Sequence, residues 1–61
     1  MGNENFEIVL ESMKEELRGL ILLGIPRPAI SAKVADHLRR DLSGEEVNRI
    51  QRLIDETKAS G

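Results

Sequence analysis

The apolar residues in the first third of the chain recur with the spacing of one helix face. Starting from Phe6 they fall alternately four and three residues apart, which places them along a single seam of an α-helix. The seam consists of Phe6, Leu10, Met13, Leu17 and Leu20, and Ile21 widens it. Gly24 follows at a position suited to the left-handed residue that closes a helix. The pattern therefore predicts a helix over residues 4–23.

Two further amphipathic segments follow. Pro28 suits the start of a helix, because proline lacks the N–H that would be unpaired there. The apolar residues after it indicate a narrow helix face over residues 28–40. Ser43 followed three residues later by Glu46 is a capping box, which predicts the start of a third helix over residues 44–59. The apolar faces of these two helices are Ile30, Val34 and Leu38, then Val47, Ile50, Leu53 and Ile54.

Length and composition make this a single all-α domain over residues 1–61, with three short helices and an aliphatic core. A core of this size leaves little stability after about 1.5 kcal/mol of ordering cost per residue is subtracted. With no cysteine and one histidine, disulfides are excluded and a structural metal is not expected. Self-association is the remaining source of additional stability. We therefore expect an intertwined or side-by-side homodimer through the seam of the first helix.

The charge balance gives no overall attraction to polyanions. The net charge is −2 and the pI is near 5.3, although residues 17–40 carry an excess of cations. The longest apolar run, residues 20–23, is too short for a membrane span, and no signal-peptide pattern opens the chain. We expect a cytoplasmic protein without a membrane partner.

The chain carries few groups suited to catalysis. His37 is its one imidazole, and a lone histidine without other soft ligands is a poor metal site. Gly19 and Gly24 are isolated, so no glycine-rich phosphate loop is present. Acidic and basic residues of the first helix, such as Glu11 with Lys14, more simply form a solvated face. We expect no enzymatic activity, no metal and no cofactor.

The sharpest pattern lies in residues 31–50. Residues 31–38 read Ser-Ala-Lys-Val-Ala-Asp-His-Leu. After a turn come Ser43 and then residues 47–50, which read Val-Asn-Arg-Ile. This stretch resembles helix-turn-helix regulators, and the resemblance implies DNA binding through Arg39, Arg40, Arg49 and Arg52. The turn is about two residues longer than in that family. Glu45 and Glu46 also occupy the start of the second helix, where carboxylates oppose contact with a polyanion.

A ribbon-helix-helix arrangement is an alternative, because Phe6, Ile8 and Leu10 alternate and two helical segments follow. Such a strand would present Glu7 and Val9 to the groove, where hydrogen-bond donors are needed to recognise bases. The helical seam explains the same residues without a strand.

We therefore expect a small non-enzymatic regulatory protein that acts by helix-mediated protein contact, as an adaptor, an inhibitor or an antitoxin-like partner. The seam is the predicted dimer or partner interface. The alternative function is that of a helix-turn-helix transcriptional regulator.

Overall fold

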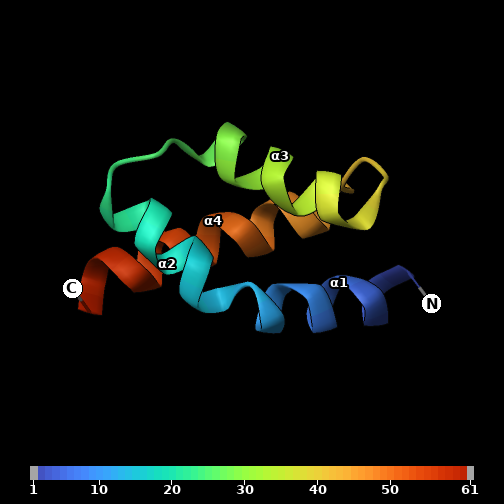
Figure 1. Cartoon of the computed structure of the whole chain (residues 1–61), viewed down its shortest axis with the longest axis horizontal. Coiled ribbons are helices and arrows are strands. Elements are labelled where there is room, and N and C mark those ends of the chain that lie inside the picture. Colours follow the sequence, from blue (N-terminus) through green and yellow to red (C-terminus); the bar gives the residue numbers. More distant parts are fainter. Residues whose placement is uncertain (1, 61) are drawn as a thin grey trace.

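The computed structural model describes the backbone of residues 2–60 and the side chains of residues 5–60. Within this range every regular element is a helix (Figure 1): α1 Gly2–Ser12, α2 Lys14–Leu22, α3 Arg27–Leu38 and α4 Gly44–Ser60. The predicted all-α class is confirmed. The predicted number of three helices is wrong, because the segment expected as one helix over residues 4–23 is divided into α1 and α2.

The chain divides at Met13, although the helical backbone hydrogen bonds of Met13 are still formed. Met13 N–H donates to Val9 O at 2.9 Å, and Leu17 N–H donates to Met13 O at 2.8 Å. The hydroxyl of Ser12 also donates to Val9 O, at 3.0 Å. A serine that bonds back to the preceding turn often bends a helix. The apolar seam thus continues around a bend, which is why its spacing gave no sign of a break.

Ten apolar residues form one core: nine come from the four helices, and Met13 lies between α1 and α2. Leu17, Ile30, Val34 and Ile50 are fully buried. The partly buried residues that pack against the core are Val9, Leu20, Ile25, Leu38 and Leu42. The core residues are Phe6, Leu10, Met13, Leu17, Ile21, Ile30, Val34, Ile50, Leu53 and Ile54. Burying side chains of this kind contributes roughly 1.5–3 kcal/mol each before ordering costs are subtracted.

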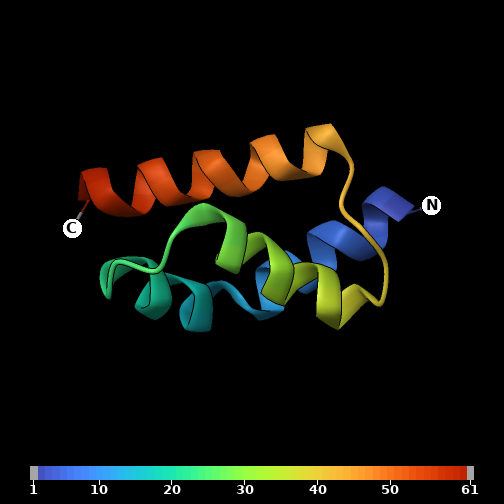
Figure 2. The ribbon, with the colours of Figure 1, turned by 90° about the horizontal axis from the view of Figure 1, so that it is seen from above.

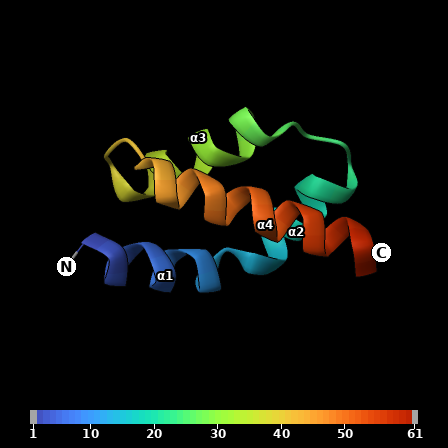
Figure 3. The ribbon, with the colours of Figure 1, turned by 180° about the vertical axis from the view of Figure 1, so that it is seen from behind.

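The helices lie along a molecule of 32 × 19 × 17 Å. α3 runs back past α1 and α2, and α4 returns behind them, packed against both α2 and α3 (Figures 1 and 2). Seen from behind, α4 crosses in front and its last turns reach the end of the molecule that holds the α2–α3 turn (Figure 3). The α3–α4 loop and the start of α1 lie at the opposite end.

The C-terminal ends of α2 and α3 each close on a residue with positive φ. Gly24 has φ 91°, Gly24 N–H donates to Ile21 O and Ile25 N–H donates to Leu20 O, which is the predicted Schellman ending of α2. α3 ends in the same way on Arg39, a residue with a side chain, at φ 60°. α3 begins at Arg27, so Pro28 is its second residue.

The predicted capping box at the start of α4 is confirmed. Ser43 Oγ accepts the N–H of Glu46 at 3.2 Å, and Glu46 Oε1 accepts the N–H of Ser43 at 2.9 Å. Leu42, just before the cap, packs against the core.

Across the described part of the chain, no helix combines the length and the apolar character that a membrane span needs.

Candidate functional site

The seam predicted as an interface lies inside the chain's own core. Five of its six residues are buried there and the sixth, Leu20, is half-buried against them. The buried five are Phe6, Leu10, Met13, Leu17 and Ile21. Their partners are residues of α3 and α4, which the spacing in the first helix could not identify. A contact between two chains that are each folded in this way would use other residues. The predicted interface and the dimer both stay predictions.

The exposed apolar side chains are the ones that the seam leaves over. Within the described residues the large exposed hydrophobics are Ile8, Leu22 and Leu23, at 66, 55 and 79 % of full exposure. Leu22 and Leu23 are adjacent at the end of α2, whereas Ile8 lies alone on α1. Leu22 also lines a shallow surface groove together with Glu15, Arg18 and Gly19.

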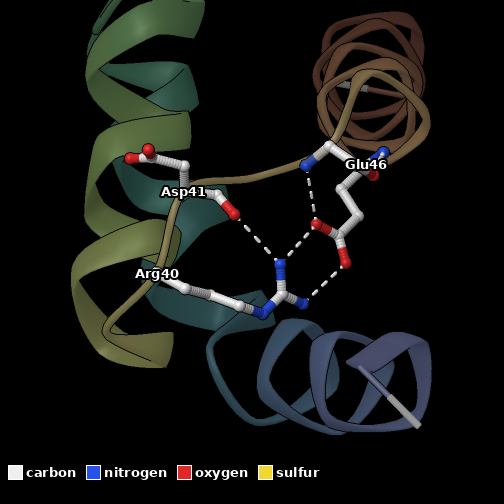
Figure 4. A network of polar contacts seen from close by, with 4 residues as sticks. Arg40, Asp41 and Glu46 are labelled. Carbon is white, nitrogen blue, oxygen red and sulfur yellow. Dashed lines mark hydrogen bonds and ion pairs between the residues drawn. The ribbon is translucent and has the colours of Figure 1, made fainter.

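Arg40, predicted as a possible DNA contact, is held by a carboxylate of its own chain. Its guanidinium donates to both carboxylate oxygens of Glu46, at 2.8 and 2.7 Å, and to Asp41 O at 3.0 Å. Figure 4 shows the side chain extending from the end of α3 to the first turn of α4. A bidentate arginine–carboxylate pair of this kind is geometrically specific.

The pairing with Arg40 changes the pKa of Glu46, whose side chain is 5 % exposed. The hydrogen bond from Arg40 and the N–H of Ser43 lower the pKa of Glu46 to about 2, against the opposing effect of burial. The same pair raises the pKa of Arg40. Of the two carboxylates that the resemblance placed toward DNA, Glu46 is thus a buried structural group, whereas Glu45 is exposed.

Arg49 is also paired. Its guanidinium bonds both carboxylate oxygens of Glu7, at 3.0 and 3.3 Å, and this contact ties α4 to α1. Both side chains are about half exposed, and the hydrogen bond to Glu7 raises the pKa of Arg49. The contribution of such an exposed pair to stability is small.

The structure does not gather the four arginines into one cationic surface. Arg39 and Arg40 line a hollow that Asp36 and Asp41 also line. Arg49 and Arg52 line another, with Glu45 and Asn48. Each hollow combines cations with carboxylates, which reduces the attraction for a polyanion.

His37 is exposed on α3. Among the described residues no group of three or more His, Cys, Asp or Glu is placed to hold a metal ion. No protein-family model, no curated protein and no solved structure matches this chain.

Proposed function

We propose that this chain is a small non-enzymatic regulatory protein that acts by protein–protein contact through its helices, as an adaptor, an inhibitor or an antitoxin-like partner. Self-association into a homodimer is the first contact that we expect. Such a function needs a surface that a second protein can cover at a gain in free energy.

The observation that carries the proposal is the exposure of Leu22 and Leu23. Ile21, directly before this pair, is buried in the core, and Ile25, two residues after it, packs against the core. The turn is therefore fixed while the two leucines stay outside. Covering a leucine gains roughly 1.5–3 kcal/mol relative to leaving it in water. Single scattered apolar residues are ordinary on a surface, whereas Leu22 and Leu23 are adjacent and both more than half exposed, which supports a contact there.

The charge arrangement favours a protein over DNA as the partner. Two of the four candidate arginines bond carboxylates of the same chain, and Glu45 is exposed in the first turn of α4. DNA affinity depends on cations that replace counterions along the phosphate backbone. Here the cations are distributed among acids, and the helix that should meet the groove begins with a carboxylate.

The test compares two kinds of partner. A photo-crosslinking residue at position 23 should form protein adducts in cells, whereas the same residue at position 55, an exposed site on α4, should form few. Labelled random-sequence duplex DNA should show no binding at low salt. Salt-sensitive DNA binding that disappears in the variant Arg39→Ala, Arg52→Ala would contradict the proposal and support the helix-turn-helix alternative.

A further inference from the structure

The groove on the outer face of α2 has two features that the fold of the single chain does not explain. The first is Gly19, an exposed residue in the interior of a nine-residue helix. A Cβ built on it would meet no atom within 4 Å, so no close packing within the chain requires a glycine there. A glycine in a helix interior is nevertheless unfavourable compared with alanine.

The second feature is a pair of side chains without ion-pair partners. Glu15 and Arg18 line the groove on which Gly19 and Leu22 lie. Like several other exposed charged residues, Glu15 and Arg18 form no ion pair in the described part of the chain, so both are open to a partner. The groove thus combines an apolar residue, an open backbone position and one charge of each sign.

These features decide which kind of occupant fits. A uniformly acidic partner would lose at Glu15 what it gains at Arg18, and a uniformly basic partner would do the reverse, so the groove favours neither. A two-fold axis brings a patch against its own copy, so a self-associating patch must carry complementary groups within itself. The presence of one carboxylate and one guanidinium beside an apolar residue meets this condition.

We propose that the outer face of α2 binds a second copy of this chain, with the two α2 helices packed antiparallel about a two-fold axis near Gly19. This inference rests on the proposed function, because it names the residues through which the proposed homodimer would form. The absent side chain at Gly19 lets the two backbones approach closely, and Leu22 of each chain covers that position on the other. Leu23 packs at the edge of the contact. Glu15 of each chain pairs with Arg18 of the partner subunit, because both side chains are long enough to cross the interface.

Sedimentation velocity over a hundredfold range of protein concentration tests whether the outer face of α2 forms the dimer contact. The wild type should associate to a dimer, and Leu22→Ser or Leu23→Ser should raise the dissociation constant about tenfold or more, because each removes a leucine from the contact. Ile8→Ser is the matched control, since it removes an exposed apolar residue of similar size from α1 and should leave dimerisation unchanged. Circular dichroism of every variant should remain helical.

A charge exchange tests the orientation. Glu15→Arg and Arg18→Glu should each weaken the dimer by about threefold to tenfold, and the double variant should regain most of the affinity, because the reciprocal pairs are restored with their signs reversed. A double variant no stronger than the single ones would overturn the antiparallel pairing. A wild type that stays monomeric, or a dimer lost in Ile8→Ser but kept in Leu22→Ser, would overturn the face. None of these results decides between protein and DNA as the functional partner, which the crosslinking and DNA titration decide separately.

Discussion

Arg40 and Glu46 are joined by two hydrogen bonds of 2.8 and 2.7 Å, and the same carboxylate closes the capping box by accepting the N–H of Ser43. One buried carboxylate therefore fixes both the loop after α3 and the start of α4. The free energy of this arrangement depends on the charge of Glu46.

Acid should destabilise the protein through this pair. Because the pKa of Glu46 is about 2 in the folded chain, below its ordinary value of 4.5, the stabilisation is complete above pH about 5 and is lost as the pH falls toward 2. We expect on the order of 1 to 2 kcal/mol, after allowance for the exposure of Arg40. Urea unfolding at a series of pH values should show a shallower acid loss in Glu46→Gln, which should also be less stable at neutral pH. The exposed neighbour Glu45→Gln should follow the wild type, and equal acid profiles for all three proteins would contradict this role.

Removing the other half of the capping box should loosen α4. Ser43→Ala leaves the N–H of Glu46 without its acceptor, so the free energy of unfolding should fall by about 1 kcal/mol. Ser12→Ala is the control, because that hydroxyl bonds back within α1 and does not cap a helix start. Coinciding denaturation midpoints for Ser43→Ala and the wild type would show that the cap does not stabilise the helix.

The end of α3 offers a stabilising substitution. Arg39 holds φ 60°, a conformation that glycine adopts at no steric cost and that other residues adopt at a penalty. Arg39→Gly should therefore raise the free energy of unfolding by about 0.5 to 1 kcal/mol. Arg52→Gly, an exposed change in the interior of α4, should lower it by about as much. If both variants lose stability, the strain at Arg39 is not the dominant effect.

The sequence predicted those features that depend on neighbours within one or two helical turns. Gly24 and the Ser43–Glu46 box act locally, so their spacing alone was sufficient. The bend at Met13 was missed because the apolar seam continues through it. The role of Arg40 was also missed, because its partner lies across a loop and a sequence shows only that an arginine follows a helix.

For a related reason, the sequence could not decide whether the seam is buried within one chain or between two chains. A regular apolar seam shows that a helix face is covered, but the spacing does not show whether the cover is another helix of the chain or a second chain. The sequence already placed Leu22 and Leu23 beyond the seam, together with Ile21. The structure was needed to show that Ile21 is buried and that only the two leucines stay exposed.

Leu17 should matter for folding before any association. It is fully buried, so Leu17→Asp should place a charge in the core and unfold the chain, while Leu17→Ala should cost about 2 to 5 kcal/mol. Lys14→Ala, on the exposed side of the same helix, should change little. Circular dichroism at several protein concentrations separates folding from association. A folded, helical monomer of Leu17→Asp would mean that Leu17 belongs to an interface between chains.

Gly19 should show a conflict between stability and association. Its backbone is that of an ordinary helix residue, and an added Cβ meets open space, so Gly19→Ala should stabilise the single chain by about 0.5 to 1 kcal/mol. The same methyl group would separate the two α2 helices where we propose that they approach most closely, so dimerisation should weaken. Thermal unfolding at low concentration, where the monomer prevails, should show the gain, and sedimentation at high concentration should show the loss. Ala59→Gly, near the exposed end of α4, gives the cost of glycine away from the groove. If Gly19→Ala raises stability without weakening association, the glycine is not at the contact, and the two-fold axis must lie elsewhere on the molecule.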